Sequence, residues 1–208
     1  MIGRPSIFRS QTCDKLDPSG VIFPYAGFSG GIFVDCSIHG IHLACWFFRQ
    51  DSTVKSVVSS GITAVQPDLR KHNDRDNAVG SVDFHGGRIA YLYCSRMMAA
   101  DQEDLTEVVG TEGKLTINMQ PQTNLVNIYE PSGIRRQIPG TYYGRFEQAF
   151  VTEANEFTAA CLDNYMLPMK LSGAVQALKV ECALQESLTT GSKISFDETG
   201  KIIEKAGF

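Results

Sequence analysis

Residues 78–118 read AVGSVDFHGGRIAYLYCSRMMAADQEDLTEVVGTEGKLTIN, and this stretch decides the predicted fold. It contains short, often β-branched segments, and turn signals separate several of them: the pair Gly86-Gly87 and the stretch from Gly110 to Gly113. Runs of this kind, bounded by glycine-rich turns, are typical of strands joined by hairpins. The segments are 78–84, 88–95, 106–109 and 114–118. The stretch therefore predicts an antiparallel meander.

Helical patterns flank this run of strands. The apolar segment 30–48 precedes it, and segments 142–162 and 171–188 follow it with apolar residues at three- and four-residue steps. Further strands are predicted at 5–12, 54–64, 125–129, 134–138 and 193–196. This order indicates an α+β fold: an open, mostly antiparallel β-sheet with helices packed on one face. We expect residues 1–208 to form a single domain.

The composition excludes several classes of protein. The chain has 208 residues, and its apolar share of 43% is too high for a disordered protein. The formal net charge of −4 gives no basic footprint for nucleic acid. No apolar run approaches the roughly 20 residues of a membrane helix, and the six scattered cysteines favour buried free thiols. We expect a cytoplasmic protein that binds neither nucleic acid nor a membrane.

A second stretch, SGGIFVDCSIHGIHLACWFF (29–48), carries the candidate chemistry. At about 100° per residue on an α-helix, His39 lies about 40° to one side of Asp35 and His42 about 20° to the other. A carboxylate that holds an imidazole is the arrangement that a general acid or base needs near neutral pH. Three interpretations remain open: a structural polar cluster, acid/base catalysis, and a metal site of two histidines and one carboxylate.

Aromatic and amide side chains complete the predicted site. Trp46 extends the line of Asp35 and the histidines along the same helix, and Tyr25 lies in the long loop that precedes this helix. Tyr142 and Tyr143 stand at the start of a later helix and offer two hydroxyl groups. We predict that these four aromatic residues and Gln11 bind the substrate.

Four stretches of the chain share the order and spacing of a known family. They are GRPSIFRSQTCD (3–14), SGGIFVDCSIHGIHLACWFF (29–48), GTEGKLTIN (110–118) and YYGRFEQAFVTEANEFTAA (142–160). Together they resemble the C-terminal domain of the Gfo/Idh/MocA oxidoreductases, especially inositol-dehydrogenase-like members. The resemblance implies that Asp35 and His39 match two catalytic residues of the family's GG-x3-D-x3-H-D-x-D helix. In the family, this histidine takes or gives the hydroxyl proton during hydride transfer to or from NAD(P).

Two departures from the family pattern shape the functional hypothesis. No GxGxxG motif follows a predicted strand, and Met1 stands where the family's nucleotide-binding domain ends, so we expect no Rossmann domain and no bound cofactor. The family's H-D-x-D also reads His39-Gly40-Ile41-His42 here, which replaces two acidic positions.

We therefore predict a cofactor-independent acid/base enzyme of isomerase, cyclase or lyase type that acts on a small oxygenated metabolite. Its catalytic residues would be Asp35, His39 and His42, without a metal ion. One alternative is the substrate-binding and oligomerisation domain of an NAD(P)-dependent sugar or inositol dehydrogenase, and another is a non-catalytic dimeric binding module. A sheet covered on one side leaves its other face open, so we expect a homodimer through that face.

Overall fold

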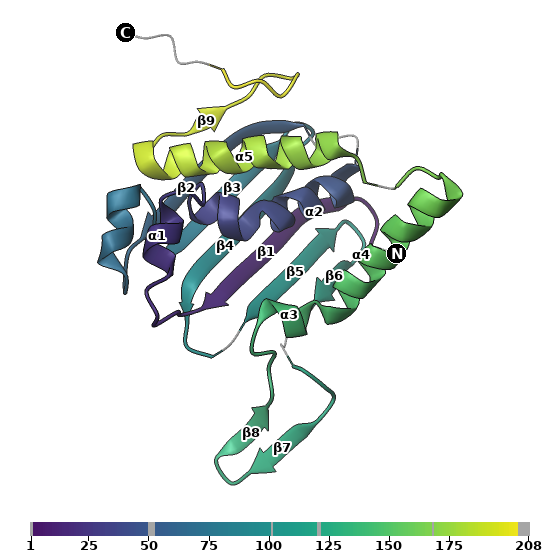
Figure 1. The fold of residues 1–208 in the computed structure, drawn as a ribbon. Coiled ribbons are helices and arrows are strands. Elements are labelled where there is room, and N and C mark those ends of the chain that lie inside the picture. The colour runs from purple at the N-terminus through teal and green to yellow at the C-terminus, as the bar shows by residue number, and fades with distance from the viewer. Residues whose placement is uncertain (1, 50–52, 101, 120–121, 168, 204–208) are drawn as a thin grey trace.

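The computed structural model describes residues 2–49, 53–100, 102–119, 122–167 and 169–203. At its centre is a seven-stranded sheet in the order β6-β5-β1-β4-β3-β2-β9. The strands are β1 (Pro5–Lys15), β2 (Val54–Ile62), β3 (Asn77–Phe84), β4 (Arg88–Met98), β5 (Glu103–Gly110), β6 (Lys114–Ile117) and β9 (Ile194–Ser195). Figure 1 shows an open sheet with helices lying across one face. The predicted α+β fold class is confirmed.

One pair of neighbouring strands is parallel. β1 lies between β4 and β5, and it runs parallel to β4 and antiparallel to β5. The other described pairs of this sheet are antiparallel. Because parallel strands need a crossover, the helical segment between β1 and β2 carries the chain over the sheet face (Figure 1). β2, β3 and β4 form the predicted meander, whereas β1 separates β4 from β5.

Helices cover one face of the sheet, and the core lies between them and that face. The π-helical turn η1 (Phe33–Ser37) continues into α2 (Ile38–Phe48), and α5 (Leu171–Thr190) packs beside both. At one end, α1 (Ile22–Ala26) contacts the 3-10 helix η3 (Pro67–His72). The sequence predicts one plain helix over 30–48, but the structure starts it with a wider π turn. Among the described residues, no helix is long and apolar enough to cross a membrane.

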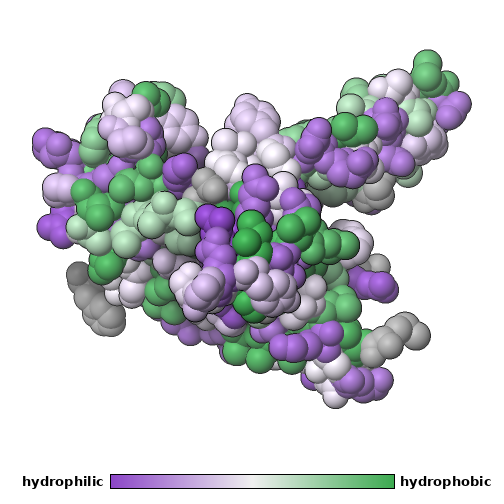
Figure 2. Space-filling view, turned by 90° about the horizontal axis from the view of Figure 1, so that it is seen from below, coloured by the Kyte–Doolittle hydropathy of each residue, from purple (hydrophilic) through white to green (hydrophobic). Residues whose placement is uncertain are grey.

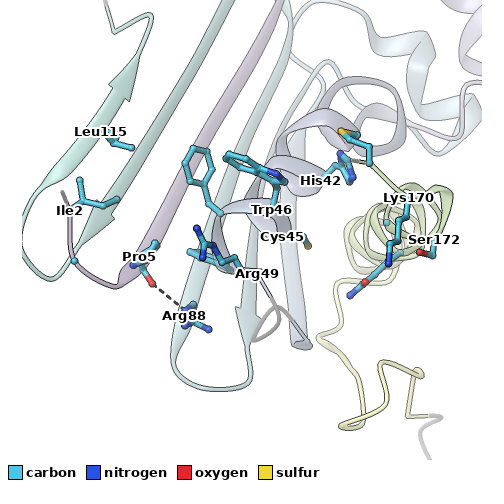
Figure 3. Close-up of a pocket in the computed structure, with 16 residues that line it drawn as sticks. Ile2, Pro5, His42, Cys45, Trp46, Arg49, Arg88, Leu115, Lys170 and Ser172 are labelled. Carbon is cyan, nitrogen blue, oxygen red and sulfur yellow. Dashed lines mark hydrogen bonds between the residues drawn. The ribbon is translucent and has the colours of Figure 1, made fainter. Parts of the chain in front are cut away.

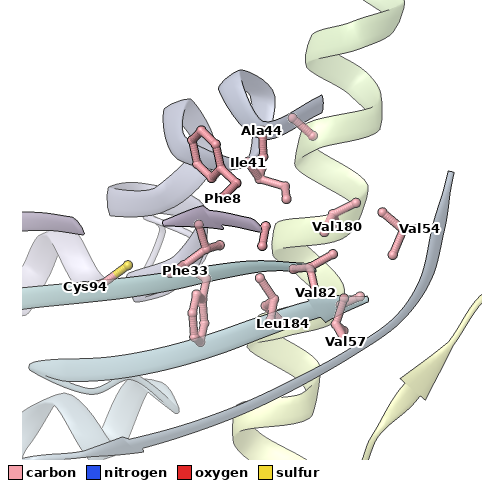
Figure 4. Packing of buried hydrophobic residues seen from close by; sticks show 14 of the residues in the cluster. Phe8, Phe33, Ile41, Ala44, Val54, Val57, Val82, Cys94, Val180 and Leu184 are labelled. Atoms are coloured by element: carbon pink, nitrogen blue, oxygen red, sulfur yellow. The ribbon is translucent and has the colours of Figure 1, made fainter. Parts of the chain in front are cut away.

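The main core fills the space between the sheet and the helices α2 and α5 (Figure 4). Phe8, Val57 and Val82 point inward from three strands, and Ile41 and Leu184 meet them from the helices. These five side chains are at most 1% exposed. Burying a side chain of this size contributes about 1.5–3 kcal/mol, so this layer holds the helices on the sheet.

Two parts of the chain lie outside this core. The hairpin of β7 (Asn127–Glu130) and β8 (Gly133–Arg136) forms a separate sheet, and every residue of both strands is exposed. After it come α3 (Tyr142–Arg145) and α4 (Glu147–Asp163), in which Ala160 alone is buried. Figure 2 views the molecule from below, the end at which the hairpin projects in Figure 1, and shows hydrophobic residues at the surface there. The predicted meander therefore does not extend to β7 and β8.

Candidate functional site

A hollow of about 280 Å³ lies where the C-terminal parts of β1 and β4 meet α1 and η1. Its lining combines carboxylates, cations, an amide and a phenol with two aliphatic side chains: Asp14, Lys15, Asp17, Val21, Ile22, Tyr25, Asp35, Gln66 and Arg96. Convergent polar groups of this kind in a concave site are typical of a small-molecule pocket. We take this hollow as the candidate functional site.

Asp35 is held from two sides. Its Oδ1 accepts a hydrogen bond from the Tyr25 hydroxyl at 2.6 Å, and its Oδ2 accepts one from the Arg96 guanidinium at 2.7 Å. The Arg96 side chain is only 4% exposed, and it also forms an ion pair with the fully buried Asp74. Charge-assisted hydrogen bonds are roughly twice as strong as neutral ones. One buried cation therefore fixes the orientation of the Asp35 carboxylate.

Asp74 connects this cluster to the start of the helix. Its Oδ1 accepts a hydrogen bond from the backbone N–H of Ile32 at 2.8 Å, immediately before the π turn. On the other side, the Gln185 side chain of α5 accepts a longer bond from the N–H of Phe33 at 3.5 Å. The first N–H groups of a helix have no partner within it, so these side chains satisfy them. The turn that carries Asp35 is thus anchored at its beginning.

The electrostatics of the site follow from these contacts. The Tyr25 phenol donates to a carboxylate and would lose that bond on ionising, which raises the pKa of Tyr25 to about 12. Burial raises the pKa of the Cys36 thiol well above its usual range, and its Sγ lies 3.6 Å from Asp14 Oδ2. A buried thiol of this kind is unreactive. Cys36 therefore has a structural role.

The structure does not bring the two predicted histidines to the Asp35 carboxylate. Asp35 instead accepts hydrogen bonds from Tyr25 and Arg96, and neither histidine lines its hollow. His39 is exposed and forms no hydrogen bond or ion pair within the described part of the chain. His42 faces a different hollow. The catalytic roles of His39 and His42 stay predictions.

The predicted substrate-binding residues are also separated. Tyr25 lines the hollow of Asp35, but Gln11 donates to Glu103 Oε1 at 2.8 Å. Gln11 faces the open side of the sheet, because its neighbour Ser10 faces Gly40 of α2 and side chains alternate along a strand. Gln11 therefore does not line the hollow.

Tyr142 and Tyr143 lie side by side on α3. Their ring centroids are 4.2 Å apart, and they are 46% and 64% exposed. Interaction with the Tyr143 hydroxyl raises the pKa of Tyr142, and desolvation and the negative charge of Asp14 add to this shift. Although neither tyrosine lines the hollow, Tyr142 is within electrostatic reach of an aspartate that does.

A larger hollow of about 1410 Å³ lies between α2, the start of α5 and the beginning of β1 (Figure 3). His42 and Trp46 face it, and Arg49, Arg88 and Lys170 are its basic residues. Its described lining contains no carboxylate, so it does not reproduce the predicted carboxylate–imidazole pair. Within the described residues, no group of three or more His, Cys, Asp or Glu side chains could hold a metal ion.

Gly40 shows why this chain departs from the family's acidic pattern. A Cβ atom at Gly40 would lie 2.6 Å from Ser10 Oγ and 3.0 Å from Ser10 Cβ. An aspartate, which the resemblance places at this position, would therefore force α2 away from β1. Glycine here allows the helix to pack closely on the strand.

Sequence analysis missed Arg96, Asp74 and Asp14. Arg96 follows a predicted strand, and Asp74 lies in a segment of mixed charge, so no local pattern connects either residue to Asp35. Short Asp side chains often accept hydrogen bonds from neighbouring backbone N–H groups, and Asp74 accepts one from the N–H of Arg75. Its bond to Ile32, 42 positions earlier, has no such local signal.

The fold and site define an α+β domain whose single helical layer presents an anchored aspartate to a polar hollow. A model of the GFO/IDH/MocA C-terminal domain matches residues 1–116, more than half of the 208-residue chain. The chain belongs to this family. The resemblance noted in the sequence is confirmed.

Relatives of known name are oxidoreductases. The chain is 28% identical to the scyllo-inositol 2-dehydrogenase (NAD(+)) of Bacillus subtilis, and the match covers 94% of this chain and 56% of that protein. It is also 28% identical to an uncharacterised oxidoreductase of the same organism, with 97% of this chain and 58% of that protein covered. The chain thus spans less than two thirds of the length of these relatives.

Solved structures of inositol dehydrogenases share the fold. The scyllo-inositol dehydrogenase of Lactobacillus casei, crystallised with NAD(H) and scyllo-inositol, matches with a TM-score of 0.86 and 28% identity over 93% of this chain and 57% of that chain. The myo-inositol 2-dehydrogenase of Lactobacillus plantarum matches with a TM-score of 0.88 and 26% identity over 94% of this chain and 58% of that chain.

These relatives correct the predicted enzyme class. The sequence alone favours a non-redox isomerase or cyclase, because no nucleotide-binding motif follows a predicted strand and two acidic positions of the family pattern differ. The named relatives are dehydrogenases, one of them NAD-dependent, and none is an isomerase. The non-redox interpretation is therefore wrong, and the dehydrogenase alternative is better supported.

Proposed function

We propose that this chain is the substrate-binding and oligomerisation domain of an NAD(P)-dependent inositol or sugar dehydrogenase. The observation that carries the proposal is the anchoring of Asp35, the residue that matches a catalytic aspartate of the family, at the hollow's wall by Tyr25 and Arg96. An anchored carboxylate beside a hollow is a pre-organised group for orienting a substrate hydroxyl.

The hollow suits a polyol better than an apolar or anionic ligand. Asp14, Asp17 and Asp35 supply carboxylate oxygens that accept hydrogen bonds from hydroxyl groups. Lys15 and Gln66 supply donors on the same wall. Three carboxylates outnumber the two cations of the lining and disfavour an anion, whereas a ring of hydroxyls can both donate and accept.

Asp35 and His39 have separate roles in this proposal. Arg96 fixes Asp35, which orients a substrate hydroxyl in the hollow. His39 does not line the hollow, so its role as proton acceptor rests on its match to the family histidine and requires the substrate to extend beyond the hollow to reach it. His39 is accessible because no described side chain binds it.

The described residues of this chain do not fit a dinucleotide. No glycine-rich turn leads from a strand of the sheet into a helix with the GxGxxG spacing that cradles a pyrophosphate. The nicotinamide, which serves as hydride acceptor or donor when bound, would be held by a separate nucleotide-binding domain.

The open face of the sheet supports an oligomerisation role. Ile7, Val79, Ile89 and Tyr91 lie on this face and are each 41–53% exposed. The register places Ile7 beside Ile89, so two of them are adjacent across β1 and β4. Apolar side chains gathered on one face are typical of a protein–protein interface. We propose a homodimer through this face.

Isothermal titration with scyllo-inositol tests the binding role. The unaltered chain should bind scyllo-inositol, and Asp35→Asn should weaken binding by about tenfold or more, the effect of losing one charged hydrogen bond. Glu198→Gln, which changes an exposed carboxylate outside the hollow, is the matched control and should bind normally. Absence of binding to the unaltered chain, or equal binding by both variants, would contradict the proposal.

A further inference from the structure

Glu181 is a fully buried carboxyl group that the proposed reaction does not use. It lies on α5 with an exposure of 0%, and its Oε2 is 2.8 Å from the hydroxyl oxygen of Ser37. The same Ser37 oxygen is 2.9 Å from the backbone carbonyl oxygen of Phe33. Ser37 and Phe33 are the last and first residues of the π turn η1. Glu181 therefore contacts one end of the turn that carries Asp35.

Counting hydrogens assigns a protonation state to Glu181. A serine hydroxyl has one proton to donate. The Phe33 carbonyl can only accept, so both short contacts of Ser37 are satisfied when Ser37 donates to Phe33 and accepts a hydrogen bond from Glu181. An ionised Glu181 could only accept, and it would compete with Phe33 for the single Ser37 proton. The two contacts together therefore favour a neutral carboxylic acid at Glu181.

The surroundings of Glu181 agree with this assignment. Its Oε1 has no hydrogen-bond partner within the described structure, which would be costly for a charged oxygen. The titratable groups that interact with it electrostatically are thiols: Cys45 of α2, Cys94 of β4 and Cys182 of α5 itself. No described cation forms an ion pair with it. Burial raises the pKa of Glu181 to about 8.

α5 also fixes the other end of the π turn. Gln185, one helical turn after Glu181, accepts a hydrogen bond from the N–H of Phe33 at 3.5 Å. A Cβ atom on Gly31 would lie 2.2 Å from the Gln185 side chain, so the chain enters the turn in direct contact with α5. Asp35 is the middle residue of the turn that these two α5 side chains hold.

We propose that Glu181, in its protonated form, is a positioning residue that donates to Ser37 and thereby fixes the π turn in the form that directs Asp35 to Tyr25 and Arg96. The consequence of this positioning role for substrate binding rests on the proposed function. The effect of Glu181 on the π turn and on the Asp35–Tyr25 contact is independent of the proposed function.

The first test measures the free energy of unfolding against pH. A group whose pKa is raised by folding stabilises the protein fully below its unfolded pKa, and this contribution is lost as pH rises toward the folded pKa. From pH 4.5 to about 8, the unaltered chain should lose the stability that depends on protonated Glu181. Glu181→Gln, whose amide can still donate to Ser37, should remove this pH dependence. Glu186→Gln, at an exposed position of the same helix, should leave it unchanged.

The second test follows Asp35 through Tyr25. At pH 6, where Glu181 is protonated, ultraviolet resonance Raman spectroscopy should show the Tyr25 hydroxyl of the unaltered chain as a hydrogen-bond donor to Asp35. If Glu181 fixes the turn, Glu181→Leu and Ser37→Ala should weaken this donor signal, while Glu181→Gln should keep it. Tyr25→Phe identifies the signal.

The outcomes separate this inference from the proposed function. If scyllo-inositol does not bind but the Tyr25 donor signal at pH 6 responds to Glu181→Leu, the proposed function fails and the positioning role stands. If Glu181→Leu fails to fold, Glu181→Gln and Ser37→Ala still decide the matter. A Tyr25 donor signal at pH 6 that is the same in Ser37→Ala as in the unaltered chain, or a pH dependence of stability that Glu181→Gln leaves intact, overturns the positioning role.

Discussion

Arg96 determines the geometry of the site at the scale of single residues. Its guanidinium contacts Asp35, which lies 61 positions earlier in the chain, and Asp74, which lies 22 positions earlier. Removing two charges from water is costly, and such an arrangement is stable only when the ions compensate each other. Arg96 therefore matters chiefly because its loss would leave Asp74 buried without a partner.

Replacing Arg96 with methionine should destabilise the chain strongly. Arg96→Met keeps much of the side-chain volume but leaves the buried Asp74 carboxylate uncompensated, so we expect a loss of about 3–5 kcal/mol in the free energy of unfolding in urea. Lys71→Met removes the exposed Lys71–Asp68 ion pair and is the control, with an expected change of about 1 kcal/mol or less. Similar losses in the two variants would contradict the role given to Arg96.

The Tyr25–Asp35 hydrogen bond should make stability depend on pH in the alkaline range. The pKa of Tyr25 is raised by folding, so its contribution is present below the ordinary pKa of 10 and is lost as pH rises toward about 12. Between these values, the unaltered chain should lose more stability than Tyr25→Phe, which has no phenol to ionise. Parallel thermal melts of the two proteins across this range measure the difference, and identical slopes would contradict the prediction.

Residue spacing alone reveals only part of such a site. The sequence marked Asp35 and Tyr25 as site residues, and the structure places both at one hollow. It could not reveal Arg96 or Asp74, because an ion pair between distant segments exists only after the chain has folded. It also paired Asp35 with two histidines, whereas the partners of Asp35 in the structure are Tyr25 and Arg96, which come from other segments.

The helices and strands were easier to predict from the sequence than the contacts between them. The seven segments predicted as strands between residues 54 and 138 correspond to β2 through β8, because alternation and turn signals act locally. The parallel pairing of β1 with β4 was not predictable, since strand order depends on long-range packing. The π turn leaves no clear signature in composition. Its stability comes from α5, which is more than a hundred residues away.

Gly40 tests how closely α2 must approach the sheet. In a helix interior, replacing glycine with alanine ordinarily stabilises by about 0.5–1 kcal/mol. At Gly40 the new Cβ would lie 2.6 Å from Ser10 Oγ, so Gly40→Ala should instead destabilise by about 1–3 kcal/mol, measured by chemical denaturation.

Two further variants isolate the steric cause at Gly40. Gly144→Ala is the matched control, because no other atom lies within 4 Å of its added Cβ, and it should not destabilise. Adding Ser10→Gly to Gly40→Ala should recover part of the lost stability, since it removes the atoms that the new Cβ meets. A stabilising effect of Gly40→Ala alone would show that the helix can move away without cost.

At the scale of the whole molecule, apolar surface is distributed unevenly. The helical layer covers one face of the sheet, and the other face exposes a band of aliphatic and aromatic side chains. The sequence predicts this asymmetry, because one helix, a run of strands and two further helices indicate an α+β fold with its helices on one face. It did not predict that the hairpin of β7 and β8 would project from the body, because a hairpin pattern looks the same whether or not it joins the main sheet.

The open face should mediate self-association. Specific dimers commonly bury about 1,200–2,000 Å² in total, and a sheet face that carries Ile7, Val79 and Ile89 provides an apolar centre for such a contact. Sedimentation velocity of the unaltered chain should show a dimer. Val79→Asp would place an unpaired charge in the interface and should raise the dimer dissociation constant by at least tenfold, equivalent to about 1.4 kcal/mol. Val65→Asp, at a similarly exposed position outside the strands, should leave the dimer intact. A monomeric unaltered chain, or equal effects of the two substitutions, would exclude this face as the interface.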